Sequence, residues 1–385
     1  MPIQLKGLTW AHPRATSPLE AAKEPLRQLR PDITISWEVQ PLSGFEGRPI
    51  VEAARNYDLI VFDHPHVGEV AESELFEPVG SFLQTIGVGD ADFIGPALAS
   101  YRYGEHVWGF PLDAACQVSC WRPDLLAGLG GTMPQDWAGV LELGEQALRK
   151  NLRLAIAFSG VHSLMTLLTL CANQGAPLSS SSTAAFADRD AARNALGAMR
   201  DLLRFCPPQT LDWDSIAAQE AMSTRDDLVY CPAVYGFAPY SRVGRPRALV
   251  YGDLPGLRAG FAGSTLGGAG LGISAYTNHP DAAFAVAGFL IDARVQEEII
   301  ALNDGQPARL NAWESARVNT RSGGFYSLTK RTLEQAWIRP RWSGYLHFQR
   351  AGGPLVESFL RGHASMEDTL DRLEQAWAAA LPEAH

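Results

Sequence analysis

The sequence predicts an α/β protein of two lobes, each a mainly parallel sheet flanked by helices, with a ligand cleft between the lobes. A chain of 385 residues exceeds the usual size of a single hydrophobic core, so two lobes are expected. Strand and helix patterns alternate from residue 3 to residue 63, the order that produces parallel strands with right-handed crossovers. An extended segment over residues 107–122 then leaves one compact unit and enters another.

The first lobe begins with a strand over residues 3–10, where apolar residues partly alternate. A helix is predicted over residues 17–29, because a Ser-Pro pair suits its cap and first position. Residues 33–39 carry apolar side chains at period two, which is typical of a strand. A short helix over 52–57 and a buried strand over 57–63 complete the pattern.

Ligands of such sheets bind at the carboxyl ends of the parallel strands. Three loops of the first lobe are therefore expected at the binding crevice: residues 11–15, 41–48 and 64–68. In the second lobe, helices are predicted over 137–148, 163–174, 190–205, 215–223 and 365–381, and strands over 154–160 and 227–237.

The extended segment contains a W-x-x-P-x-D pattern formed by Trp108, Pro111 and Asp113. Later segments follow in a characteristic order: a Gly-rich strand over 264–274, an Asn-x-Pro-x-Ala-Ala helix start at 278–283, and a Gly-x-Pro loop at 305–307. This order resembles the family 1 extracellular solute-binding proteins of ABC importers, a group that includes the maltose-type receptors. The resemblance implies the two-lobed periplasmic-binding-protein fold of type II and spans nearly the whole chain.

The resemblance also implies how the lobes divide the chain. Lobe 1 is expected to comprise residues 1–112 and 251–308, and lobe 2 residues 113–250 and 309–385. The implied function is reversible capture of a small polar solute, sugar-like or carboxylate-bearing, by hinge closure. The protein would capture this solute for an ABC-type uptake system, whose membrane subunits are the implied partners, or would be a cytoplasmic relative of such a receptor. No cofactor or metal is expected, and we expect a monomer.

A second class of function stays open from the residues alone. His12, His64 and His66, with Asp63 beside them, could supply acid–base groups near neutral pH. The chain would then be a cytoplasmic enzyme or a ligand-sensing accessory protein on the same scaffold. Because binding alone needs no such chemistry, an enzyme is the less favoured of the two classes.

Composition limits the partners and the location of the chain. A net charge of −10 argues against nucleic acid, whose phosphates need a basic surface. No stretch approaches the roughly 20 apolar residues of a membrane span. The first ten residues lack the apolar core and cleavage site of a signal peptide, which predicts a cytoplasmic location, or a periplasmic one if the chain is a processed form.

Candidate ligand-binding residues lie on the predicted cleft loops, on the crossover and on strand-end segments. They are Trp10, His12, Arg14, Asp63, His64, His66, Asp113, Ser159, His162, Tyr235, Phe237, Ser264 and Trp342.

Several of these candidates have a second interpretation. Trp10 could stack on a flat ligand face or simply be a core residue. Arg14 could hold a carboxylate in a bidentate way or be a solvated surface residue. Ser159 and His162 lie at a helix start, where exposed N–H groups suit an anion or a hydroxyl. The His-x-His pair at 64–66, together with His12 and Asp63, could form a zinc site, but no Cys or Glu ligand joins the cluster at a standard spacing.

The five cysteines are odd in number and loosely spaced. Cys116 and Cys120 lie on one face of a predicted strand but too far apart to bridge. Free buried thiols are therefore expected.

Overall fold

The computed structural model describes residues 2–42, 44, 48–179, 186–258 and 263–381. Contacts between Cα atoms divide the chain into two compact units. Unit 1 comprises Met1–Ala115, Gly267–Ser322 and Arg341–Ser343. Unit 2 comprises Cys116–Leu266, Gly323–Pro340 and Gly344–His385.

The sheet of unit 1 is built around its first strand, β1 (Ile3–Trp10), which pairs in parallel with β2 (Ile33–Gln40) and β3 (Leu59–Phe62). Next to β3 lies β10 (Leu266–Ile273), which runs antiparallel, followed by the first part of β6 (Phe110–Trp121). The predicted α/β order is confirmed, and the returning strand β10 makes the sheet mixed rather than wholly parallel.

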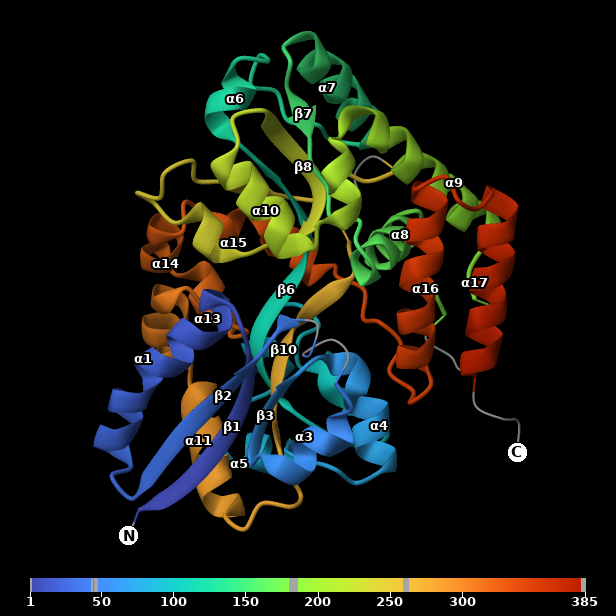
Figure 1. Cartoon of the computed structure of the whole chain (residues 1–385). Helices are drawn as coiled ribbons and strands as arrows, with labels where there is room; N and C mark the ends of the chain where they lie inside the picture. The colour runs from blue at the N-terminus through green and yellow to red at the C-terminus, as the bar shows by residue number, and fades with distance from the viewer. Residues whose placement is uncertain (1, 43, 45–47, 180–185, 259–262, 382–385) are drawn as a thin grey trace. The chain divides into compact units, whose positions relative to one another are not determined.

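Two crossover helices flank this sheet, α1 (Pro13–Leu29) and α3 (Ile50–Asn56). The chain crosses from β1 to β2 in one direction and from β2 to β3 in the other. Right-handed crossovers therefore place the two helices on opposite faces, as Figure 1 shows.

The first helix begins earlier than the sequence predicts, at Pro13 instead of residue 17. His12 provides the cap, because its side chain accepts a hydrogen bond from the backbone N–H of Arg14. Pro13 occupies the first turn, and Pro18, which was expected there, lies inside the helix. This correction places Arg14 in the first helical turn.

The other elements of unit 1 lie between β3 and β6 or after β10 in the sequence. They are η1 (His64–His66), α4 (Val67–Glu72), α5 (Gly80–Thr85), η2 (Asp90–Asp92), η3 (Ala99–Tyr101), β4 (Arg102–Tyr103), β5 (His106–Val107), α11 (Pro280–Leu290), α12 (Ala293–Val295), η7 (Gln296–Ile300), η8 (Ala301–Asn303), α13 (Leu310–Glu314) and α14 (Ala316–Arg321).

The sheet of unit 2 uses the second part of β6, which runs antiparallel to both β8 (Leu228–Tyr235) and β9 (Val250–Gly252). The short strand β7 (Arg153–Leu154) is parallel to β8. The predicted strand over 154–160 ends at Leu154, because Phe158 and Ser159 donate their backbone N–H groups to a neighbouring loop instead of to a ladder.

Helices cover the sheet of unit 2, and α8 (Val161–Asn173) is buried along nearly its whole length. The remaining elements are α6 (Pro123–Ala127), α7 (Trp137–Arg149), α9 (Arg189–Leu202), η4 (Leu203–Phe205), η5 (Pro208–Asp212), α10 (Ser215–Thr224), η6 (Ala238–Ser241), α15 (Phe325–Glu334), α16 (Tyr345–Leu360) and α17 (Met366–Ala380).

All five cysteines are free and buried, as predicted. Burial raises the pKa of the Cys171 thiol to about 12, which keeps it protonated. Among the residues that the structure describes, no helix is both long and apolar enough to cross a membrane.

Candidate solute-binding site

The junction between β1 and α1 brings three predicted residues together in unit 1. The Nδ1 atom of His12 lies 3.0 Å from the backbone nitrogen of Arg14 and accepts its hydrogen. In the neutral imidazole the proton is then on Nε2. The His12 ring stacks on Trp10, with 5.8 Å between ring centroids and 17° between planes. Capping therefore fixes both the position and the tautomer of His12.

Arg14 forms a two-pronged ion pair with Asp113. Its Nε atom lies 2.8 Å from Oδ2 of Asp113, and its Nη2 atom bonds Oδ1. The Arg14 side chain is 4% exposed and that of Asp113 12% exposed. Asp113 comes from β6, a strand of the same sheet as β1, so residues 99 positions apart in the sequence meet within one unit. The solvated alternative for Arg14 is thus not what the structure shows.

Trp10 is buried, with 4% of its surface exposed. The guanidinium carbon of Arg14 lies 5.8 Å from its ring centroid, so the indole packs against both neighbours. A small cavity of about 20 Å³ adjoins this cluster, lined by Thr9, Trp10, Arg14, Asp113 and Gln306 among others. Its volume suits a single water molecule and not a sugar.

A second group of predicted residues follows β3. The Nδ1 atom of His64 lies 3.3 Å from Oδ1 of Asp63, and that of His66 lies 3.9 Å from Oε2 of Glu69. Both imidazoles are buried, and the His64 ring meets Tyr101 edge-on. Within the described ranges, no group of three or more His, Cys, Asp or Glu side chains could hold a metal ion.

The remaining cleft loop of the first lobe is only partly visible. Positions 43 and 45–47 of the predicted loop 41–48 lie outside the described residues. Arg48, at its end, pairs with Glu52, with 2.8 Å between Nη2 and Oε1.

In unit 2, Ser159 and His162 lie where α8 begins. The backbone N–H groups at this turn are already bonded: that of Gly160 to a carboxylate oxygen of Glu357 at 2.8 Å, and that of Ser159 to the carbonyl of Trp213 at 3.0 Å. The anion expected at this helix start is therefore the protein's own Glu357, which corrects the prediction of N–H groups open to a ligand.

The His162 side chain is buried and its Nδ1 atom lies 3.1 Å from the hydroxyl of Ser215. Burial lowers the pKa of His162 to about 4, an effect that the charge of Asp214 partly offsets. The imidazole is therefore neutral near pH 7.

The aromatic candidates of unit 2 are positioned by a residue that the sequence does not single out. Gln219 donates to the carbonyl of Tyr235 at 3.0 Å and accepts from the backbone N–H of Phe237 at 3.0 Å. Phe237 is buried and Tyr235 half-buried. Ser264 is wholly buried as well.

Trp342 is buried and belongs to unit 1, whereas the sequence places it in the second lobe. The short segment that carries it packs against Gly68, where an added Cβ would lie 1.9 Å from the carbonyl oxygen of Arg341. The guanidinium of Arg341 donates to the carbonyl of Ala99 at 2.7 Å and to that of Arg102 at 2.6 Å.

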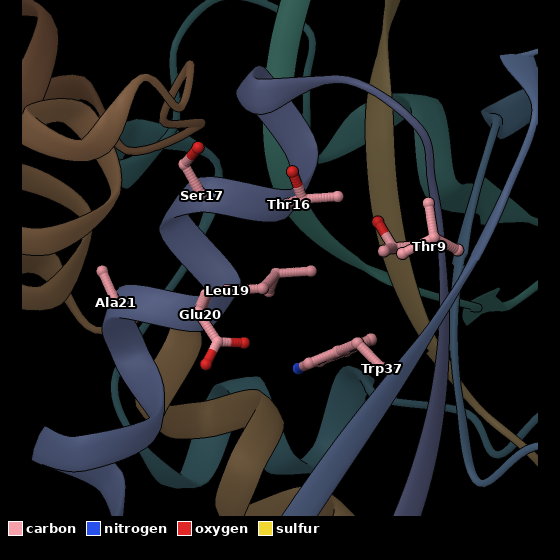
Figure 2. Close-up of a pocket in the computed structure, with 8 residues that line it drawn as sticks. Thr9, Thr16, Ser17, Leu19, Glu20, Ala21 and Trp37 are labelled. Carbon is pink, nitrogen blue, oxygen red and sulfur yellow. The ribbon is translucent and has the colours of Figure 1, made fainter.

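A larger cavity of unit 1, of about 610 Å³, was not anticipated from the sequence. Figure 2 shows it between α1 and the ends of β1 and β2. It is lined by Thr9, Thr16, Ser17, Leu19, Glu20, Ala21, Trp37 and Val39. The signal that could have found it is the register of the two strands, which sets Trp37 opposite Gly7.

Solved structures of other proteins share this fold. The maltose-bound MalE3 of T. maritima is 17% identical, with 98% of this chain and 100% of that chain covered and a TM-score of 0.84. A solute-binding protein of an ABC transporter from Thermotoga lettingae, bound with α-D-tagatose, is 15% identical, with 98% and 100% covered and a TM-score of 0.83. One from Agrobacterium radiobacter, in complex with ribitol, is 17% identical, with 99% of each chain covered and a TM-score of 0.78. The predicted solute-binding fold is confirmed.

The family model for bacterial extracellular solute-binding proteins matches residues 13–297. The chain belongs to this family, which binds small solutes and works with components of ABC transporters. No curated protein sequence matches the chain.

Proposed function

We propose that the solute is a neutral polyhydroxyl molecule, a sugar or a polyol, and that the Arg14–Asp113 pair of unit 1 forms the floor of its binding site, reached at the exposed edge of Asp113 and not through the small cavity. The observation that carries this proposal is the ion pair itself. Both prongs of the guanidinium are engaged by Asp113, so a solute carboxylate would have to displace a buried partner. A solute hydroxyl, in contrast, can donate to the exposed edge of the Asp113 carboxylate without breaking the pair.

The relatives of known structure support this choice of solute. Their ligands include maltose, α-D-tagatose, ribitol and D-mannitol, all of which are polyhydroxyl compounds. His12 caps the helix that carries Arg14 and so belongs to the same junction. No group in this arrangement is needed to transfer a proton to or from the solute, which favours binding without turnover over the enzyme alternative.

The first test is a calorimetric panel of sugars, polyols and carboxylates on the purified chain, with native mass spectrometry of any copurified solute. We expect a sugar or polyol to saturate the protein unchanged. Asp113→Asn should weaken that binding at least about tenfold, or ~1.4 kcal/mol. Asp124→Asn is the matched control, because Asp124 also pairs with a buried arginine, Arg122, but lies in unit 2. Saturation by a carboxylate alone would contradict the proposal.

Closure of the two lobes on the solute stays a prediction, as do the monomeric state and the location of the chain. Small-angle scattering with and without a saturating solute measures closure as a decrease in radius of gyration. Light scattering measures the oligomeric state, and fractionation of the native cells distinguishes a cytoplasmic from a periplasmic protein.

A further inference from the structure

The larger cavity of unit 1 is formed by side chains on one face of two paired strands. Gly7 lies opposite Trp37, and Thr9 lies opposite Val39 in the parallel register. Because side chains alternate at period two, all four positions share one face of the sheet. The first turns of α1 face these strands across the cavity, which measures about 610 Å³ (Figure 2).

Trp37 supplies an aromatic surface to this cavity. A Cβ atom added to Gly7 would lie 2.3 Å from the Cε3 atom of Trp37, so the glycine is what allows the indole to lie against the backbone of β1. The side chain is only partly buried and lines the cavity. Within the described residues, its indole N–H makes no hydrogen bond, so both the ring and its donor are available to a ligand.

The hydroxyl of Thr9 is an unsatisfied polar group on the cavity wall. Thr9 is 1% exposed, and its Oγ1 atom has no hydrogen-bond partner among the residues that the structure describes. A buried hydroxyl without a partner costs about 1–3 kcal/mol, so such a group calls for an explanation. Figure 2 shows Thr9 and Thr16 on opposite walls; the Thr16 hydroxyl donates to the backbone carbonyl of His12 at 3.1 Å, and the Ser17 side chain points away from Thr9 and Trp37.

The charges at the cavity cancel locally. Glu20 lines the wall opposite the indole, and its carboxylate is paired with Lys23 at 2.5 Å. An ionic ligand would therefore meet no net opposite charge. An aromatic surface with one unsatisfied hydroxyl and one carboxylate acceptor is instead suited to the apolar face and the hydroxyl groups of a sugar ring.

We propose that this cavity is a second binding site, for a neutral pyranose ring that stacks on Trp37 and hydrogen-bonds to Thr9 and Glu20. The site is separate from the one centred on Arg14 and Asp113, although Thr9 and Leu19 line both cavities. It takes the same chemical class of ligand but depends on different side chains, so it can exist whether or not the proposed function holds.

Fluorine NMR of the full chain labelled with fluorotryptophan tests the proposal, with methyl β-D-glucopyranoside as the probe. Comparison with Trp37→Phe assigns the Trp37 resonance. We expect this resonance to shift in a saturable way as the sugar is added, in the wild type and equally in Asp113→Asn. Thr9→Val preserves the shape of the side chain but removes its hydroxyl, and it should weaken the response about fivefold to tenfold, the effect of one lost hydrogen bond.

Thr34→Val is the matched control, because Thr34 lies on the same strand β2 but is exposed and does not line the cavity. It should leave the response unchanged, and circular dichroism should confirm that each variant is folded. A Trp37 resonance that does not move up to the solubility limit of the sugar overturns the second site. Loss of the response in Asp113→Asn also overturns it, since the shift would then come from the first site. If Asp113→Asn does not weaken binding of the solute identified by calorimetry, that result contradicts the proposed function and leaves the second site unaffected.

Discussion

The candidate site residues of unit 1 include a pair of charged side chains, Arg14 and Asp113. In unit 2, the candidate His162 at the start of α8 instead pairs with a neutral side chain. Arg14 and Asp113 are joined by two charged hydrogen bonds with little exposed surface. His162 and Ser215 share a single hydrogen bond of 3.1 Å, and burial holds the imidazole in its neutral form. In these two places, the buried charge has a charged and well-aligned partner, and the imidazole that faces a neutral hydroxyl stays uncharged.

The largest change in the free energy of unfolding is expected from breaking the charged pair of unit 1. Asp113→Ala leaves the Arg14 guanidinium buried without its carboxylate, and should lower the free energy of unfolding by about 3–5 kcal/mol. Urea unfolding followed by circular dichroism measures this. The double variant Arg14→Met with Asp113→Leu should recover most of the loss, because it removes both charges from the interior. A single-variant loss below about 1 kcal/mol would mean that the pair is solvated.

The neutral pair should make unit 2 sensitive to acid. The pKa of His162 is about 4 in the folded chain and 6.5 as its ordinary value, so the unfolded chain binds the proton more readily between these two values. The stabilising contribution is therefore complete above pH 6.5 and is lost as the pH falls towards 4. We expect the loss to be on the order of 3 kcal/mol.

Other groups also titrate in this range, so the measurement is the difference between the wild type and His162→Gln in urea unfolding at several pH values. Glutamine can still meet the Ser215 hydroxyl but does not titrate. If the free energy of unfolding changes with pH in the same way in both proteins, His162 does not titrate differently in the folded and unfolded chains. The contrast with unit 1 would then be lost.

A smaller effect is expected from removing the hydroxyl that partners the neutral imidazole. Ser215→Ala leaves the buried Nδ1 atom of His162 without this contact and should cost about 1–2 kcal/mol at neutral pH. Combining Ser215→Ala with His162→Gln in a double-mutant cycle isolates the interaction between the two side chains. Strict additivity of the two losses would mean that the 3.1 Å contact contributes nothing to stability.

The sequence predicts the elements of this fold better than it predicts their ends. Alternation at period two locates β2 to within a residue, because it reflects burial on one face of the strand. The start of α1 is wrong, because a Ser-Pro pair is a common start signal and histidine is not a usual cap. The strand predicted from residue 154 ends early, because the backbone groups that follow bond to a loop that is near in space but remote in sequence. Local sequence does not reveal this contact.

The candidate site was predictable only in part, for a related reason. Position at the ends of parallel strands selects His12 and Arg14, but not the partner of Arg14, which lies 99 residues away. Arg14 alone was therefore compatible with a solvated surface residue. The sequence predicts Trp37 only as part of a strand, because its position at the cavity depends on the register with Gly7. Pairings across a sheet are tertiary information, and they decide which side chains face a cavity.

The smallest expected change in stability separates two roles of His12. His12→Asn keeps an acceptor at the cap of α1, since asparagine is among the best capping residues, and should change the free energy of unfolding by less than about 0.5 kcal/mol. His12→Ala removes the cap and should cost about 1 kcal/mol. Both variants remove the imidazole, with its Nε2–H group, from the junction of β1 and α1. If that donor binds the solute, calorimetry should show the same loss of affinity in both, although only the alanine variant is destabilised. Full affinity in His12→Asn would limit His12 to capping, and would leave the ion pair as the solute-binding feature of this junction.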